Sequence, residues 1–202
     1  MVEDLLTNIG PLAPISLYYL GGDGAEGTPT GPEQGPFPAL PPDRLRRQRG
    51  ADLGERMSSA FAEVFVRTGT DRVLLIGSDI PHITADLLED YFSKLDEHDV
   101  VLGPAEDGGY YLVGLHRTSF TPALFEDIPW STGRVRRETV RRAEKLGLSV
   151  YLGPTLRDID TLEDLEVVLR RSARILPSLA RFASTGAFFS SSAVGSTAAA
   201  PS

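Results

Sequence analysis

The sequence contains no cysteine and no apolar run long enough to cross a membrane. Without cysteine there is no disulfide, no thiolate nucleophile and no cysteine-ligated zinc, which fits a reducing compartment. Basic residues are outnumbered by acids, and the net charge is −8. This charge argues against a surface for nucleic acid or anionic membrane, because either needs a basic patch. The acidic start of the chain does not resemble a signal peptide, so we expect a cytoplasmic protein.

A length of 202 residues with 41% hydrophobic residues is typical of a globule with one sizeable core. We expect one domain over residues 1–171, with a long Gly/Pro-rich loop over 21–50. Six Gly and six Pro fall within 21–43, so neither a helix nor a strand is expected there. Such a loop is either a binding segment or a surface insertion. Residues 172–202 contain eight Ser, eight Ala and no acid, which predicts a disordered tail.

Short apolar runs alternate with helical periodicity along the domain. This alternation predicts a three-layer α/β fold with a mostly parallel sheet. We expect strands at 15–20, 73–76, 100–102, 110–115 and 148–152. We expect helices at 2–9, 53–68, 84–95, 135–146 and 162–171.

The apolar run 73–76 leads directly into Gly77, Ser78 and Asp79. Ligands of open α/β sheets bind beyond the carboxyl ends of strands. Phosphate transfer needs a divalent ion, and Mg²⁺ prefers one or two carboxylates. Asp79 is therefore a candidate metal ligand or catalytic acid. An Asp that caps the next turn is an equally good interpretation.

The run 100–102 leads into Glu106, Asp107, Gly108 and Gly109, followed by Tyr110. Paired glycines allow a backbone to approach a ligand closely, and adjacent carboxylates can bind sugar hydroxyls or act as a base. The alternative is a tight hairpin turn, for which Asp-Gly is a favoured dipeptide. Two acids in the turn favour a site.

Asp158 and Asp160 lie two residues apart before Thr161, so an extended segment would point both carboxylates to one side. Ordinary helix capping by Asp160 and Thr161 is the favoured interpretation when this segment is taken alone.

The segment Trp130, Ser131, Thr132 could stack on a ligand ring, although a lone Trp is more often part of a core. Beyond it, Arg134, Arg137 and Arg141 share a helical face. They could bind phosphate, and an acidic protein needs such cations or a metal to do so. A solvated face is the favoured interpretation.

Several of these segments together resemble one bacterial family, the glycosyltransferase-A-like "transferase 1" family. It is a domain of unknown function that is often associated with radical-SAM and selenoprotein-domain genes. The resemblance covers about residues 52–171 and lies in the segments DLGERM, LLIGSDIPHIT, VVLGPAEDGGYYLVGL, IPWST and DIDTLEDL. More distantly, the chain resembles nucleotidyltransferases that activate molybdopterin or phospholactate.

The resemblance implies a nucleotide-diphospho-sugar transferase fold. It implies that Asp79 and Asp160 bind Mg²⁺ or Mn²⁺, and that Asp107, Gly108 and Gly109 line a pocket for the sugar or acceptor. The substrates would be a nucleotide or nucleotide-sugar and a small-molecule acceptor. Three hypotheses remain open: a glycosyltransferase, a nucleotidyltransferase using a nucleoside triphosphate, and a non-catalytic nucleotide-binding or interaction protein.

Members of the family begin with a first strand and a basic loop resembling K-x-P-x-P-G-x-x-K-T-R-L. Met1 falls downstream of this pattern. The resemblance therefore predicts an N-terminally truncated domain without the nucleotide-binding loop and with an exposed sheet edge. A start codon assigned too late, a fragment and an inactive relative would each explain it.

Overall fold

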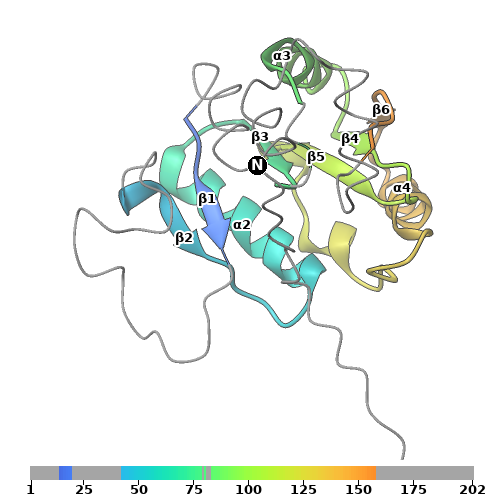
Figure 1. The fold of residues 1–202 in the computed structure, drawn as a ribbon, viewed down its shortest axis with the longest axis horizontal. Helices are drawn as coiled ribbons and strands as arrows, with labels where there is room; N and C mark the ends of the chain where they lie inside the picture. The colour runs from blue at the N-terminus through green and yellow to red at the C-terminus, as the bar shows by residue number, and fades with distance from the viewer. Residues whose placement is uncertain (1–13, 20–41, 79, 81–82, 158–202) are drawn as a thin grey trace, which may run out of the picture.

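The structure is a computed structural model that describes residues 14–19, 42–78, 80 and 83–157. Figure 1 shows the arrangement of the elements. In chain order the elements are β1 (Leu17–Tyr19), η1 (Pro42–Arg44), β2 (Leu45–Arg47), α2 (Leu53–Thr68), β3 (Arg72–Ile76), α3 (Ala85–Lys94), β4 (Val100–Pro104), β5 (Tyr110–His116), η2 (Arg117–Ser119), η3 (Pro122–Phe125), α4 (Val135–Lys145) and β6 (Val150–Leu152). The expected helices at 2–9 and 162–171 and the tail lie outside the described residues.

The larger sheet has the strand order β3-β5-β4-β6. β5 pairs antiparallel with both of its neighbours, whereas β4 and β6 are parallel. The expectation of a mostly parallel sheet is therefore wrong for this sheet, which is mixed. Residues 105–109 alone connect β4 to β5, and parallel neighbours would require a crossover of a dozen or more residues.

β1 and β2 form a separate parallel pair. β1 falls within the strand expected at 15–20. η1 and β2 lie inside the range expected to be an irregular loop over 21–50, so residues 42–47 correct that expectation. A three-residue strand that contains two arginines is too short and too polar to give a clear sequence signal.

The helices begin and end at strong local signals. The Asp52 carboxylate accepts the Glu55 amide at 2.8 Å, the Glu55 carboxylate accepts the Ala51 amide, and Gly69 ends α2 with a φ of 71°. The bounds of α2 match the expected helix. Thr84 caps α3 as predicted, with its hydroxyl accepting the Leu87 amide at 3.3 Å. Capping satisfies backbone groups that a helix terminus otherwise leaves unpaired.

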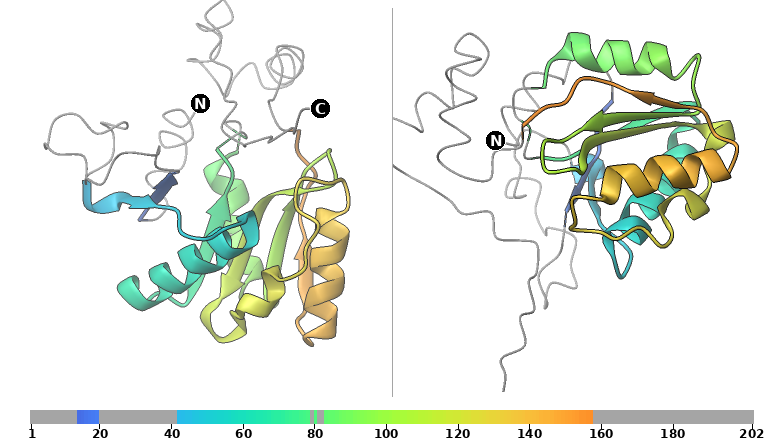
Figure 2. Two further views of the ribbon diagram at one scale, coloured as in Figure 1. Left: turned by 90° about the horizontal axis from the view of Figure 1, so that it is seen from below. Right: turned by 90° about the vertical axis from the view of Figure 1, so that its right-hand side faces the viewer.

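The sheet lies between two helical layers, as predicted. Figure 2 shows α3 on one face and α2 with α4 on the other. One core cluster includes Leu88 and Tyr91 of α3, and the other includes Phe61 of α2 and Ala143 of α4. β4 is buried along its whole length, and each buried aliphatic side chain contributes about 1.5–3 kcal/mol.

β3 is less buried than its apolar sequence predicted. Its residues are all half-buried rather than enclosed on both faces. β3 pairs with β5 and occupies one end of the described four-stranded sheet, which accounts for the difference. Within the described residues, no helix combines the length and apolarity needed to cross a membrane.

Asp99 joins three elements at the end of the sheet where β4 and β6 begin. Its carboxylate accepts the Ser119 hydroxyl at 2.5 Å, and the Ser149 amide and hydroxyl at 2.9 and 2.7 Å. These hydrogen bonds lower the pKa of Asp99 below its usual value, and the bond from Ser119 has the largest effect. The folded state therefore favours the charged carboxylate.

We expect Asp99→Asn to lower the free energy of unfolding at pH 7 by about 1 kcal/mol, because the three charge-assisted hydrogen bonds to this partly exposed group weaken or are lost. The lowered pKa means that this stabilisation is present above about pH 4 and is lost as the pH falls further. Urea unfolding at pH 7 and pH 3 measures both effects. The exposed Glu97→Gln is the control, and a difference between Asp99→Asn and wild type that does not shrink at pH 3 would contradict the assignment.

Candidate functional site

The predicted site segments of the described chain gather at one end of the four-stranded sheet, where β3, β4 and β6 end and β5 begins. We call this end the rim. It comprises residues 77–78, 105–110, 130–136 and 153–157. α2 and α4 begin at this end of the fold, as the left view of Figure 2 shows.

The 105–109 turn is a closed hairpin. The Ala105 amide donates to the Gly109 carbonyl at 3.1 Å, and the Gly108 amide donates to the Ala105 carbonyl at 3.2 Å. Asp107 is exposed, and its Oδ1 accepts the Gly109 amide at 2.7 Å. Both interpretations of this segment are therefore compatible, because the hairpin displays its two acids at the rim.

Gly108 and Gly133 bring two distant segments into contact. Gly108 has a φ of 92°, and a Cβ there would overlap the backbone of Gly133. The Arg136 amide donates to the Gly108 carbonyl at 3.1 Å. Only glycine fits at 108, since the conformation and the space both exclude a side chain. The 105–109 turn is thus held against the start of α4.

Trp130 is half-buried between two other predicted segments. A Cβ at Gly54 would lie 2.9 Å from the indole, and the Tyr110 ring meets Trp130 edge-on at a centroid distance of 6.5 Å. Trp130 therefore packs partly against the core, as the alternative interpretation expected. It also joins the DLGERM segment to the 105–109 turn.

Ser131 and Thr132 are exposed next to Trp130. Ser131 has a φ of 60°, and the Thr132 hydroxyl donates to the Pro129 carbonyl at 2.7 Å. The Thr132 hydroxyl also accepts the Arg134 amide at 3.4 Å. Thr132 therefore shapes the turn that leads into α4, and the Ser131 side chain is available to a ligand.

The phenol of Tyr110 points into the protein rather than toward the rim. Its oxygen is buried near Thr139, whose hydroxyl donates to the Val135 carbonyl at 3.0 Å. Burial raises the pKa of Tyr110 well above its usual value, so the phenol stays neutral. A contact between Tyr110 and a ligand, as predicted from the sequence, would have to use the backbone or the ring edge.

Gly77 and Ser78 continue β3 to the rim. The Gly77 amide donates to the Tyr111 carbonyl at 2.9 Å, and Ser78 is exposed. Asp79, the residue on which the metal prediction depends most, lies outside the described residues. Ile80 beyond it is completely buried in the core beneath α3.

Residues 153–157 run alongside the 105–109 turn. The Leu156 amide donates to the Pro104 carbonyl at 3.0 Å, and the Glu106 amide donates to the Leu156 carbonyl at 3.1 Å. Arg157 Nε lies 3.7 Å from Glu106 Oε2. The chain therefore reaches the rim just before Asp158 and Asp160, which lie outside the described residues.

Two buried tyrosines support this segment, and no sequence signal pointed to them. The Tyr91 and Tyr111 hydroxyls lie 2.9 Å apart, and Tyr111 donates to the Pro154 carbonyl at 3.1 Å. With Tyr111 donating to Pro154, Tyr91 donates to Tyr111. Gly153 packs against the Tyr91 ring, where a Cβ would overlap the phenol. These contacts connect α3, β5 and the segment after β6.

The described acids do not form a metal centre by themselves. Among the described residues, no group of three or more metal-binding side chains occurs. β3, which leads to Asp79, and β6, which leads to Asp160, are separated by β5 and β4. With strands about 4.8 Å apart, their ends lie about 14 Å apart. Binding of one ion by both acids requires the two segments to turn toward each other across the rim.

Two arginines of α4 lie on an exposed face and pair with an acid of the same helix. Arg137 and Arg141 lie 3.4 and 3.7 Å from Glu138, so this part of the helix is an exposed, charge-paired face. The favoured interpretation of a solvated face describes these two residues.

Residues 29–132 match the family described as "Uncharacterized protein conserved in bacteria (DUF2064)". A crystal structure of a protein from Desulfovibrio desulfuricans G20, named a "putative nucleotide-diphospho-sugar transferase", aligns with a TM-score of 0.75 at 38% identity. The alignment covers 86% of this chain and 73% of that one. This similarity supports the expected GT-A-like α/β fold.

A second structure, a hypothetical transferase from Thermus thermophilus, aligns at 21% identity with a TM-score of 0.49. That alignment covers 81% of this chain and 85% of the other. The comparison with curated proteins found no match.

We expect Gly108→Ala to lower the free energy of unfolding by about 2–4 kcal/mol. The alanine would have to adopt a positive φ, and its Cβ would also overlap the backbone of Gly133. Gly147→Ala is the matched control, since Gly147 has a φ of 74° with nothing within 4 Å of a Cβ. Its expected loss is about 1–2 kcal/mol from the backbone alone. Equal losses in urea unfolding would show that the Gly108–Gly133 contact does not hold the turn.

Proposed function

This chain belongs to the DUF2064 family of bacterial proteins. From its similarity to the Desulfovibrio protein we propose that it is a metal-dependent glycosyltransferase-type enzyme. Its substrate would be a nucleotide-diphospho-sugar or a related nucleotide. The observation that supports this most is the 38% identity over 86% of the chain to the Desulfovibrio protein and the name of that protein. The geometry adds that the exposed acids, the glycine turn and Trp130 belong to one rim.

The 105–109 turn is the proposed acceptor side of the site. Glu106 and Asp107 are exposed carboxylates on a turn whose backbone is fixed by hydrogen bonds to two neighbouring segments. Carboxylates in such positions can accept hydrogen bonds from a hydroxyl and remove its proton during transfer. The ion pair with Arg157 keeps Glu106 directed toward residues 153–157. We therefore assign acceptor orientation to Asp107 first and Glu106 second.

Backbone groups would line the donor and acceptor pockets, and they belong to Gly77, Ser78, Gly108 and Gly109. The pockets would be bordered by the side chains of Trp130, Ser131 and Thr132. Glycine permits a ligand to approach the backbone without a Cβ in between. Trp130 is half-buried, so the exposed part of the indole is what a base or sugar ring would contact.

Asp79 and Asp160 are the proposed ligands of Mg²⁺ or Mn²⁺. Their carboxylates have the right chemistry, and the strands that lead to them end at the rim. When bound, a divalent ion would neutralise charge on the diphosphate leaving group. The described acids have other partners, with Asp107 accepting Gly109 and Glu106 facing Arg157, so they do not compete for this role.

We expect Asp79→Asn and Asp160→Asn each to weaken Mn²⁺-dependent binding of a nucleotide-diphospho-sugar by at least about tenfold, because each removes one charged metal ligand. Calorimetric titration with UDP-, GDP- and CDP-sugars in the presence of Mn²⁺ measures this. Glu89→Gln, an exposed acid on α3, is the control. Undiminished binding by the two aspartate variants would remove the metal site from the proposal.

Product analysis with the bound donor separates the three hypotheses. Release of a nucleoside diphosphate indicates glycosyl transfer, and release of pyrophosphate from a nucleoside triphosphate indicates nucleotidyl transfer. Binding of nucleotide without any turnover of donor and acceptor would favour the non-catalytic interpretation.

A further inference from the structure

Tyr111 is an extra residue in β5, at the point where the pairing of β5 with β4 slips. Gly103 of β4 pairs with Leu112, whereas the next residue, Pro104, pairs with Tyr110. Tyr111 is left between these two pairs and forms a β-bulge, a feature that redirects a side chain. In a regular strand, consecutive side chains point to opposite faces. Here Tyr111 and Leu112 belong to the same core cluster, on the α3 side of the sheet.

A second slip lies on the other side of β4. Leu102 pairs with Leu152, whereas Ala105 pairs with Leu156. Two residues of β4 are therefore opposite three residues, 153–155, after β6. One extra residue in a strand exchanges the faces that the following side chains occupy. This slip thus determines how the chain continues beyond Leu156.

The side chain of Tyr111 connects the two slips. Its ring lies against Gly103 of β4, where a Cβ would be only 2.5 Å from the ring. Its hydroxyl donates to the Pro154 carbonyl at 3.1 Å. Proline has no amide hydrogen, so this carbonyl is the one backbone group of Pro154 that needs a partner. Tyr111 therefore crosses β4 and satisfies the extra segment after β6.

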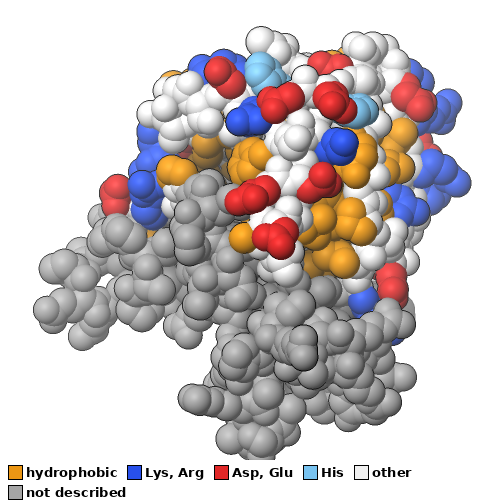
Figure 3. Space-filling model, turned by 90° about the horizontal axis from the view of Figure 1, so that it is seen from above, with side chains coloured by type: hydrophobic (Ala, Val, Ile, Leu, Met, Phe, Trp, Pro, Cys, Tyr) orange, Lys and Arg blue, Asp and Glu red, His pale blue; other side chains and the backbone are white. Residues whose placement is uncertain are grey.

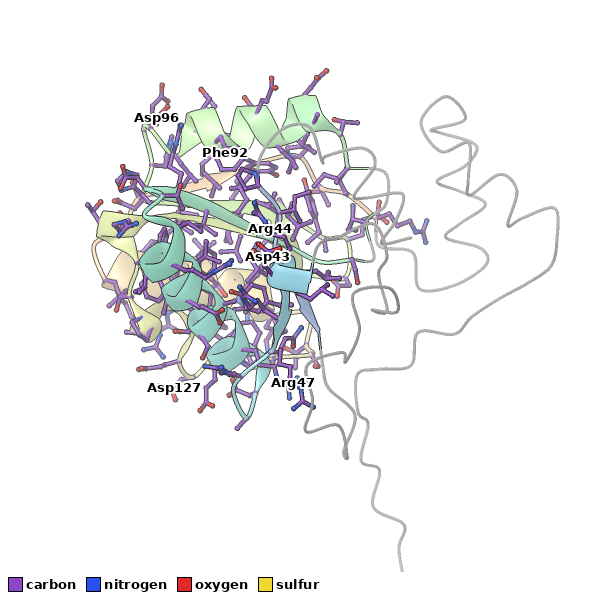
Figure 4. The ribbon with its side chains drawn as sticks, turned by 90° about the vertical axis from the view of Figure 1, so that its left-hand side faces the viewer. Asp43, Arg44, Arg47, Phe92, Asp96 and Asp127 are labelled. Atoms are coloured by element: carbon purple, nitrogen blue, oxygen red, sulfur yellow. The ribbon has the colours of Figure 1, made fainter. Side chains whose placement is uncertain are left out.

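Tyr91 holds the Tyr111 hydroxyl from the other side. Tyr91 is completely buried, and the two hydroxyl oxygens lie 2.9 Å apart. The helix that carries Tyr91 has its own anchor, because Arg72 of β3 donates to the Phe92 carbonyl and the Asp96 carboxylate, each at 2.9 Å. Figure 4 shows Asp96 just past the C-terminal end of α3. Figure 3, viewed from the α3 side, shows acidic side chains on this surface, so the polar face of α3 is turned to solvent.

Two phenylalanines would fill the same space without hydroxyl groups to satisfy, so the hydroxyl pair adds position rather than burial. We infer that Tyr111 is a positioning residue for the metal site. It fixes the extra segment 153–155, and thereby the direction in which the chain leaves the sheet toward Asp160. In this register the Glu106 amide donates to the Leu156 carbonyl at 3.1 Å. The inference rests on the proposed function, in which Asp160 binds the ion.

Three variants separate positioning from stability. Y111F removes the donor to the Pro154 carbonyl and leaves the buried Tyr91 hydroxyl without its acceptor. Y91F keeps the bond from Tyr111 to Pro154, and Y91F/Y111F removes that bond without leaving an unpaired hydroxyl. We expect Y111F to have the lowest melting temperature of the three, because a buried unpaired hydroxyl costs more than two apolar rings.

Mn²⁺ alone is the probe, and electron paramagnetic resonance of the free ion measures its binding. We expect Y111F and Y91F/Y111F both to bind Mn²⁺ about tenfold more weakly than the wild type. Y91F should change the affinity by less than about twofold. Hydrogen exchange followed by NMR gives a second readout, in which the Glu106 and Leu156 amides should exchange faster in the same two variants.

Mn²⁺ affinity that recovers in Y91F/Y111F together with the melting temperature would show a merely structural role and overturn the inference. Wild-type affinity in Y111F would overturn it as well. Absence of Mn²⁺ binding by the wild type would contradict the proposed metal site, and the inference with it. The wild-type titration alone reveals that outcome, so the two failures are distinguishable.

Discussion

Two backbone hydrogen bonds, from Arg136 to the Gly108 carbonyl and from Glu106 to the Leu156 carbonyl, hold the 105–109 turn between two segments that are distant in the sequence. The first of them depends on glycine at 108, because a side chain there would overlap Gly133 at the start of α4. Backbone contacts of this kind position a loop more rigidly than side-chain contacts, since they leave no rotamers to choose from. The rest of the rim is arranged around this turn.

The antiparallel direction of β5 places the 105–109 turn at the rim, where the proposed transfer reaction would occur. β5 runs against its neighbours, so the 105–109 turn lies at the end of the sheet where β3 and β6 also finish. Glu106 and Asp107 of this turn therefore lie at the rim. The segments that contain Asp79 and Asp160 follow strands that end at the same rim. The two buried tyrosines add support from beneath, through the Pro154 carbonyl. A ligand at this rim would contact a turn that is fixed by its backbone hydrogen bonds.

Much of this fold could be predicted from local sequence signals, because helix ends are decided by neighbours in the chain. Thr84 and Gly69 are such signals, and α2 has the bounds that its periodicity indicated. The direction of β5 was missed because an apolar run reads alike in parallel and antiparallel pairs. The short link at 105–109 was the signal available for it.

Of the site, the sequence identified the segments that meet at the rim but not the contacts that join them. The packing of Gly54 on Trp130 and the tyrosine pair depend on tertiary structure, which no spacing encodes. Asp79 and Asp160 remain predictions, because both lie outside the described residues.

The central claim is that a metal and a diphosphate occupy this rim, and paramagnetic relaxation by Mn²⁺ tests it most directly. In an NMR titration with Mn²⁺ and a nucleoside diphosphate, the account predicts strong broadening of amide signals at 77–78, 105–109 and 155–157. Signals around Asp99 and Ser149, at the far end of the sheet, should stay sharp. Broadening centred on that far end, or spread evenly over the acidic surface, would contradict the account.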